Sequence, residues 1–295
     1  MLDERGIQGL SEVLSRGTMS GLLFKVDEPI DVLVRKVRDE QLGPGAENPL
    51  YRRFQMQTNG KIRKLSVPNG SFKKLARKYI LPLIKTKKPH AACHGGEGGW
   101  SVKGSLSLHL PCTSVLSFDL SSVFENVPFD LVAGYFFDLL SDVSHFNREN
   151  IAWFLARLCT VPYSEGRRGL PQGSACSPAL FNRILYFLDD SLSRGAEQRG
   201  MIYTRWIDDM TLSCSHHMPV EQFLGAVQLT GIYFPIAPKK IYYQDGAPIY
   251  LLGHRVFPDR IEKNTREDRE RNKVEPLDYA EYVEGKNYGP WVKSQ

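Results

Sequence analysis

The amino-acid sequence predicts an α+β fold in which helices pack on one face of an antiparallel sheet. Three observations lead to this prediction. Short apolar strand patterns alternate with longer helical patterns through the middle of the chain. An Asn-Gly pair at residues 59–60 separates two strand patterns, which is typical of a β-hairpin. Two further strand patterns are joined tightly at Ile207-Asp208-Asp209.

Length and composition indicate a globular protein. The chain has 295 residues, of which 42% are hydrophobic and 24% are charged. These values exclude collagen-like, disordered and membrane-embedded classes. The length can bury a substantial core, and we expect one multi-lobed unit. A formal net charge of +5 permits a polyanionic partner without requiring one.

The sequence leads us to expect a cytoplasmic protein with no membrane partner. Acids follow Met1 where a signal peptide would be basic and then apolar. Apolar runs stay well below the roughly 20 residues that cross a bilayer. The five cysteines are scattered and form no Cys-x-x-Cys pair, so neither a disulfide framework nor a zinc site is predicted. His90, Cys93 and His94 lie close together but lack a second ligand pair at suitable spacing, so we expect no metal there.

The N-terminal part is expected to contain helices, a hairpin and a basic helix. The expected elements are amphipathic helices within residues 1–40, a loop at 41–48, strands at 51–58 and 62–67, and a helix at about 71–85. Between residues 60 and 90 the chain has ten Lys or Arg and no Asp or Glu. Such a run is usually a solvated surface, but its one-sided charge also creates a field suited to phosphates, and we expect nucleic-acid contact.

The rest of the chain supplies the predicted sheet and its helices. A flexible glycine-rich stretch at residues 95–104 precedes them. Strands are expected at Ser114–Phe118, 202–206, 210–214, 249–256 and near Arg260. Helices are expected after Asn126 as cap with Pro128 in the first turn, from Ser177-Pro178 to about residue 193, and at about 219–229. An exposed charged helix is expected at 262–273, with Glu267 and Arg271 four residues apart.

Three carboxylates are positioned to converge in this sheet. Asp119 ends one strand pattern, and Asp208 and Asp209 lie at the tip of a hairpin, so adjacent strands would cluster them. Nucleotidyl transfer with two divalent ions needs such a cluster. Chance is the alternative, because the chain has 33 acids and another pair, Asp189-Asp190, occurs late in a predicted helix.

The order of three motifs decides between these readings. The motifs are Phe118-Asp119-Leu120-Ser121-Ser122-Val123-Phe124, Leu170-Pro171-Gln172-Gly173-Ser174-Ala175-Cys176-Ser177-Pro178-Ala179-Leu180-Phe181-Asn182 and Tyr203-Thr204-Arg205-Trp206-Ile207-Asp208-Asp209. In this order they resemble the successive palm motifs of reverse transcriptases. An ordered triple is far more specific than an isolated Asp pair.

The resemblance covers roughly residues 28–262 and points to bacterial retron-type enzymes. Further segments that match their pattern are Lys61-Ile62-Arg63, Val67-Pro68, Phe72-Lys73, His109, Pro238-Lys239-Lys240 and Leu252-Gly253. The chain departs from it at three places. Trp206-Ile207 replaces the usual Tyr-Ala, Ser105-Leu106 stands in place of Asn-Ala, and Leu251-Leu252-Gly253 replaces Val-Thr-Gly. The resemblance implies a right-hand polymerase with fingers at 1–112, a palm at 113–261 that carries a fingers insertion near 145–170, and a short thumb-like lobe at 262–295.

The resemblance also implies roles for individual residues. Asp119, Asp208 and Asp209 would be catalytic ligands of two Mg²⁺ ions, and Lys240 would protonate the departing pyrophosphate. The expected nucleotide-binding residues are Lys61, Arg63, Phe124, Gln172 and Gly173, with the Phe124 ring rejecting ribose or, alternatively, packing only in the core. Lys73, Lys74, Arg77 and Lys78 are the expected RNA-binding residues. His109 is expected to be structural and is left out of the catalytic set.

A retron-type enzyme copies a structured noncoding RNA, so the resemblance implies an RNA template, dNTPs and an RNA-DNA hybrid product primed by a guanosine 2′-hydroxyl. It also implies an effector protein and a role in antiphage defence. Two alternatives stay open: another bacterial defence or abortive-infection reverse transcriptase with template-independent or protein-primed synthesis, and a non-catalytic RNA-binding scaffold for an effector.

Overall fold

The computed structural model describes residues 50–58, 61–97, 99–142, 145–163, 167–265 and 274–283. The helices expected within 1–40, the loop at 41–48, the hairpin tip at 59–60 and most of the charged helix at 262–273 lie outside these residues. The chain forms two compact units: unit 1 contains Met1–Pro89 and Phe124–Ile184, and unit 2 contains His90–Val123 and Leu185–Gln295. Within the described ranges, no helix is long and apolar enough to span a membrane.

Unit 1 begins with the predicted hairpin. Strands β1 (Tyr51–Thr58) and β2 (Lys61–Pro68) pair antiparallel, with Thr58 opposite Lys61. The predicted helix at 71–85 forms as three consecutive segments, which are α3 (Gly70–Leu75), the π-helical η1 (Ala76–Ile80) and α4 (Leu81–Lys85). The segments bury an apolar face, which consists of Phe72, Leu75, Ala76, Tyr79, Ile80, Leu83 and Ile84.

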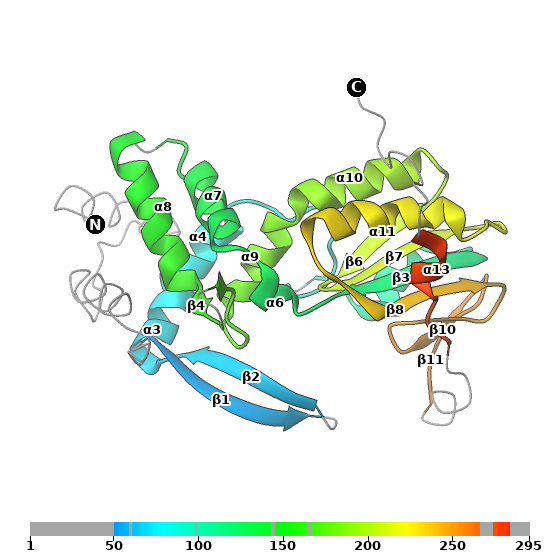
Figure 1. The fold of residues 1–295 in the computed structure, drawn as a ribbon, viewed down its shortest axis with the longest axis horizontal. Helices are drawn as coiled ribbons and strands as arrows, with labels where there is room; N and C mark the ends of the chain where they lie inside the picture. The colour runs from blue at the N-terminus through cyan, green and yellow to red at the C-terminus, as the bar shows by residue number, and fades with distance from the viewer. Residues whose placement is uncertain are drawn as a thin grey trace. The chain divides into compact units, whose positions relative to one another are not determined.

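The remainder of unit 1 is mainly helical (Figure 1). Its elements are α6 (Val123–Asn126), α7 (Phe129–Leu139), α8 (His145–Cys159), the short pair β4 (Val161–Pro162) and β5 (Arg168–Gly169), and α9 (Cys176–Ile184). The predicted cap at Asn126 is wrong, because Asn126 ends α6 and Pro128 caps α7 without a side-chain hydrogen bond. A residue before proline is driven out of the helical region, which explains the break at Val127.

Unit 2 is built on a four-stranded antiparallel sheet with strand order β6-β7-β3-β8. The strands are β3 (Ser114–Leu120), β6 (Ile202–Trp206), β7 (Asp209–Cys214) and β8 (Ile236–Asp245). Helices α10 (Tyr186–Glu197) and α11 (Glu221–Tyr233) lie along one face of this sheet (Figure 1). The long helix predicted at 177–193 is therefore two helices, α9 and α10, interrupted at Leu185, where ψ is 1°.

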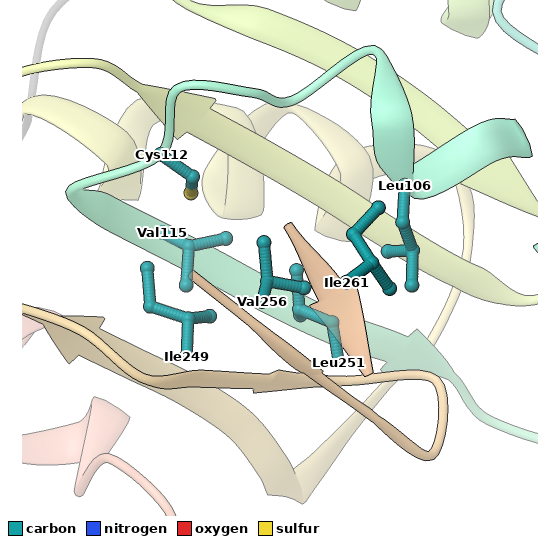
Figure 2. Close-up of a cluster of buried hydrophobic side chains, with 7 residues drawn as sticks. All are labelled: Leu106, Cys112, Val115, Ile249, Leu251, Val256 and Ile261. Atoms are coloured by element: carbon teal, nitrogen blue, oxygen red, sulfur yellow. The ribbon is translucent and has the colours of Figure 1, made fainter. Parts of the chain in front are cut away.

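A smaller sheet packs on the other side of β3. It contains β9 (Ile249–Leu251), β10 (His254–Val256) and β11 (Ile261–Lys263). Its apolar residues meet Val115 of β3 and Leu106 of α5 (Val102–Ser107) in a buried cluster (Figure 2). Because Glu262 and Lys263 belong to β11, the start predicted for the charged helix is wrong.

The last described segment attaches to the edge strand of the large sheet. It comprises residues 274–283 and ends in α13 (Tyr279–Val283). The Leu277 backbone N–H donates to the Ile241 carbonyl oxygen of β8 at 2.7 Å. The backbone of β8 is therefore bonded to β3 on one side and, at Ile241, to this segment.

Strand alternation divides the side chains of the large sheet between its two faces. Successive residues of a strand point to opposite faces, and directly paired residues point to the same face. Phe118 pairs with Met210, and both are fully buried. Asp119 pairs with Asp209 and lies on the opposite face from Phe118. Because Thr230 of α11 lies 3.9 Å from the Met210 sulfur, the helices cover the Phe118 face and Asp119 points away from them.

Candidate active site

Two of the predicted catalytic acids are direct cross-strand neighbours. Asp119 of β3 and Asp209 of β7 are Cα partners, and both are half-buried. Asp208 directly precedes Asp209 and lies in the two-residue turn that joins β6 to β7. Its carbonyl oxygen accepts a hydrogen bond from the Leu120 N–H at 3.0 Å, so the turn is bonded to the end of β3. The sheet therefore brings Asp119, Asp208 and Asp209 together at the ends of adjacent strands.

Lys240 lies on β8, on the other side of β3. Its ammonium group donates to the Asp119 carboxylate in an ion pair, although nearly half of the Lys240 side chain, 45%, is exposed. This hydrogen bond to Asp119 raises the pKa of Lys240, so the side chain carries a proton at neutral pH. The acids and Lys240 thus come from three neighbouring strands of one sheet.

Negative charge is crowded among these side chains. Burial, then the hydrogen bond and charge of Asp119, and then the charge of Asp208 raise the pKa of Asp209 to about 9, while Lys240 acts in the opposite direction. Burial and like charges at short distance both disfavour the ionised form, which explains the direction of the shift. The cluster is accordingly a place where added positive charge would be stabilised.

His109 lies in the turn after α5, and its side chain is hydrogen-bonded to two strands of the large sheet. Its side chain is fully buried, with Nδ1 2.6 Å from the Ser213 hydroxyl and Nε2 2.8 Å from the Thr204 hydroxyl. Burial, with a smaller contribution from His94, lowers the pKa of His109 to about 4. A neutral imidazole with both nitrogens hydrogen-bonded links β6 to β7, as expected for a structural histidine.

The neighbouring His90, Cys93 and His94 are engaged in packing. His94 lies within hydrogen-bond distance of the Ser105 hydroxyl, 2.7 Å, and its ring stacks on Trp100. The His90 ring contacts the Tyr186 ring edge to face. Both imidazole rings are therefore held by contacts with other side chains of the protein.

In unit 1, one loop connects several of the predicted nucleotide-binding residues. The Leu170 N–H donates to the Phe124 carbonyl oxygen at 2.7 Å, and the Gln172 carbonyl oxygen accepts from the Ser66 N–H of β2 at 2.7 Å. Gly173 has φ +115°, a conformation that favours glycine. The structure thereby brings Phe124, Gln172 and Gly173 together with the strand that carries Arg63.

The Phe124 ring has an observed packing partner. It is half-buried and meets the Phe181 ring edge to face, with centroids 5.6 Å apart. Gly169 approaches the same backbone so closely that a Cβ atom there would lie 2.4 Å from the Glu125 carbonyl oxygen and 2.7 Å from that of Phe124. The position of Phe124 is therefore fixed by close packing on both sides.

Five of the predicted cationic residues of unit 1 are exposed to solvent. Arg63 is exposed on β2, three residues before the Ser66 that bonds Gln172. Lys61 begins the same strand. The four residues predicted to bind RNA all lie on the exposed side of the α3–η1 helix, opposite its buried apolar face: Lys73, Lys74, Arg77 and Lys78.

A family model described as reverse transcriptase (RNA-dependent DNA polymerase) matches residues 53–255. The chain belongs to the reverse transcriptase family. The match includes every predicted catalytic and nucleotide-binding residue, from Lys61 to Lys240. The α+β polymerase fold expected from the motif order is confirmed.

Relatives of this reverse transcriptase include retron enzymes. It is 30% identical over 165 residues to the retron Mx162 reverse transcriptase of Myxococcus xanthus, covering 52% of this chain and 33% of that protein. It is 28% identical to the retron Ec86 reverse transcriptase of Escherichia coli, covering 55% and 48%. The matched region thus spans half or less of these relatives. The predicted resemblance to retron-type enzymes is confirmed.

Solved structures support the same fold. Apo telomerase from Candida tropicalis superposes with a TM-score of 0.53 at 10% identity, covering 75% of this chain and 49% of that one. A form truncated from the C-terminal domain gives a TM-score of 0.52, covering 72% and 55%. At these identities the likeness concerns the fold alone.

Reverse transcriptases in general use divalent metal ions, so the acids of this one must be tested against such a role. Within the ranges that the structure describes, no three His, Cys, Asp or Glu side chains are arranged as a ready metal site, and the Asp119 carboxylate contacts Lys240. The donor chemistry nevertheless fits, because carboxylate oxygens are the preferred ligands of Mg²⁺. Burial and the neighbouring carboxylates Asp119 and Asp208 raise the pKa of Asp209, so its ionised form would be stabilised by added positive charge. A divalent cation would supply it.

Sequence reasoning missed a buried ion pair beside the site. Asp189, which the sequence suggested was half of a chance Asp-Asp pair, is fully buried and bonds Arg205. One clue was available. Arg205 interrupts a strand pattern of largely apolar and aromatic residues, and a charge buried in a strand needs a partner.

Proposed function

We propose that this reverse transcriptase is an active RNA-directed DNA polymerase. The observation that carries the proposal is the register that pairs Asp119 with Asp209, with Asp208 in the adjoining turn and Lys240 on the next strand. An RNA-binding scaffold without activity would have no need for three crowded carboxylates, which are electrostatically unfavourable in the absence of a cation.

In this proposal Asp119 and Asp208 hold two Mg²⁺ ions and Asp209 is a weaker ligand. When bound, the ions would activate the primer hydroxyl and stabilise charge on the triphosphate. The primer hydroxyl loses its proton to solvent as its oxygen forms a bond to the α-phosphorus of a dNTP, while the α–β bridging bond breaks and pyrophosphate leaves. The protonated Lys240 is suited to give its proton to the departing pyrophosphate.

The proposal assigns the residues of unit 1 to the incoming nucleotide and the template. Arg63 and Lys61 would hold the triphosphate, because a guanidinium can donate two parallel hydrogen bonds to phosphate oxygens. Gln172 and Gly173 would lie beside the nucleotide, where glycine lets the backbone approach closely. The four basic residues of the α3–η1 helix would contact the template backbone.

We propose a structured noncoding RNA as template and primer, and an RNA-DNA hybrid as product. The similarity to retron reverse transcriptases supports this assignment, as well as an effector protein as partner and a role in antiphage defence. The five cysteines are all buried, and none forms a disulfide within the part of the chain that the structure describes, which supports a reducing cytoplasm. Sequencing the nucleic acid that copurifies with the chain separates this proposal from another defence reverse transcriptase.

Replacing Asp208 and Asp209 together by Asn should abolish dNTP incorporation, because neutral amides cannot hold divalent ions against the triphosphate charge. Incorporation is measured on a primed RNA template, with folding checked by circular dichroism. The matched control changes two surface acids, Asp190→Asn and Asp259→Asn, and should keep wild-type rates. Full incorporation by the folded Asp208/Asp209 variant would refute the assignment of the site.

Phe124→Val should relax the choice of sugar, because the proposed role of the ring is to exclude a ribose 2′-hydroxyl. The ratio of dNTP to NTP incorporation efficiency should fall by roughly tenfold or more. Phe129→Val, in which a half-buried ring on α7 is removed, is the control and should leave the ratio unchanged. If the ratio is the same in folded Phe124→Val, Phe124 serves only to pack against Phe181.

Neutralising Lys73, Lys74, Arg77 and Lys78 together, each to Gln, should weaken RNA binding and flatten its salt dependence. Each lost phosphate contact lowers the log-log salt slope by about 0.7 on single strands, so four contacts lower it by about 3. Arg63→Ala should instead raise the KM for dNTP with little change in RNA affinity. Fluorescence anisotropy at several salt concentrations measures the slope, and an unchanged slope in the fourfold variant would show that this helix is only solvated.

A further inference from the structure

The turn that carries Asp208 is held from within by a buried guanidinium. Arg205 of β6 is fully buried on the helix face of the sheet. Its Nη1 donates to the Ile207 carbonyl oxygen at 2.8 Å, directly beside the Asp208 peptide. One side chain therefore connects the body of the strand to the turn that follows it.

The same guanidinium is anchored to helix α10. Its Nε and Nη2 donate to the two oxygens of Asp189, at 2.8 and 2.7 Å, in a bidentate pair whose side chains are both inaccessible to solvent. The Tyr203 hydroxyl donates to the same carboxylate at 2.8 Å. Burial alone would lower the pKa of Arg205, but the charge of Asp189 outweighs it and raises it. Because the guanidinium group is planar and two of its nitrogens bond Asp189, the direction of its third hydrogen bond, to the Ile207 carbonyl oxygen, is also restricted.

The turn itself has a backbone conformation that needs support. Ile207 has φ +60°, a left-handed conformation that β-branched residues rarely adopt. Such conformations persist where the surroundings over-determine them, and they cluster at functional sites. Arg205 supplies one constraint at the Ile207 carbonyl group.

Gly95 supplies a second constraint on the same turn. The segment around it runs alongside β6, with the Arg205 N–H donating to Ala92 at 2.8 Å and the His94 N–H donating to Arg205 at 2.9 Å. A Cβ atom on Gly95 would lie 2.6 Å from the Ile207 nitrogen and 2.9 Å from the Trp206 carbonyl carbon. Because both are backbone atoms, a larger residue could be accommodated only if the turn moved.

We infer that Arg205 is a positioning residue that, anchored by Asp189 and opposed by Gly95, fixes the Ile207–Asp208 turn and so aims the Asp208 carboxylate. The inference deepens the proposed function and rests on it for the role of Asp208. Arg205 touches neither substrate nor metal in this account. It holds the Asp208 carboxylate, which would bind the metal, in position, as groups that bond to metal ligands commonly do.

Two variants test this positioning role from independent directions. Arg205→Lys keeps a buried cation but cannot bond both Asp189 oxygens and Ile207 at once. Gly95→Ala leaves the ion pair intact and pushes on the turn. Their controls are Tyr203→Phe, which removes a bond to Asp189 without touching Ile207, and Gly134→Ala on α7, where an added Cβ meets nothing within 4 Å.

Three measurements on the folded full chain distinguish positioning from general stability. Hydrogen exchange of the peptide that contains the Ile207–Asp209 amides reports the turn directly and needs no activity. Binding of Mn²⁺ alone, followed by electron paramagnetic resonance, reports the acids. The kcat and the KM for dNTP, together with RNA affinity, report catalysis. In Arg205→Lys and Gly95→Ala we expect faster turn exchange and a loss of about 10- to 100-fold in Mn²⁺ affinity or kcat, with unchanged RNA affinity.

The outcomes separate failure of this inference from failure of the proposed function. If the wild type polymerises DNA and binds Mn²⁺, but both folded variants match it and the controls in exchange, Mn²⁺ affinity and kcat, Arg205 is merely structural. If the wild type is inactive while the variants still speed turn exchange and weaken Mn²⁺ binding, the proposed function fails and the positioning role stands. If Arg205→Lys does not fold, Gly95→Ala decides, and wild-type turn exchange in that variant overturns the inference.

Discussion

The antiparallel register of β3 between β7 and β8 is the constraint from which the candidate site follows. Because residues directly opposite one another share a face, pairing Phe118 with Met210 on the helix side forces Asp119 and Asp209 onto the other side. A slip of one residue would bury a carboxylate against the helices and expose Phe118. The hydrophobic pattern that makes the sheet fold therefore also places the acids together, on the face that α10 and α11 leave open.

Two opposite electrostatic arrangements flank the turn between β6 and β7. Asp189 and Arg205 form a compensated pair on the buried side, where an isolated charge would be very costly. On the other side, Asp119, Asp208 and Asp209 outnumber Lys240, and the pKa of Asp209 is raised to about 9. The compensated pair can hold the turn rigid, while a cation on the other face would stabilise the crowded acids. In the proposed function, structural support and metal binding are therefore divided between the two faces of one sheet.

Much of the fold could be predicted because the relevant patterns are local. The Asn-Gly pair predicted the first hairpin, the short apolar strand patterns predicted β3, β6 and β7, and the order of the motifs predicted the family. The cap predicted at Asn126 failed for a local reason, the proline at 128, whereas the other failures depended on contacts between distant segments. The split into α9 and α10 at Leu185 has no obvious local cause, and Asp189 looked like a chance acid because its partner Arg205 lies 16 residues later on a different element. Gly95 was visible only as one glycine among several, because its role depends on a backbone that passes beside Ile207.

We propose that the sheet register creates a cation site from Asp119, Asp208 and Asp209. Thermal unfolding with and without Mg²⁺ tests it most directly, because a ligand that binds only the folded state stabilises it, by about 2.7 kcal/mol at a hundred times its dissociation constant. The account predicts that Mg²⁺ raises the unfolding temperature of the wild type and leaves that of the Asp208→Asn/Asp209→Asn variant unchanged. The same shift in both proteins, or none in the wild type, would contradict it.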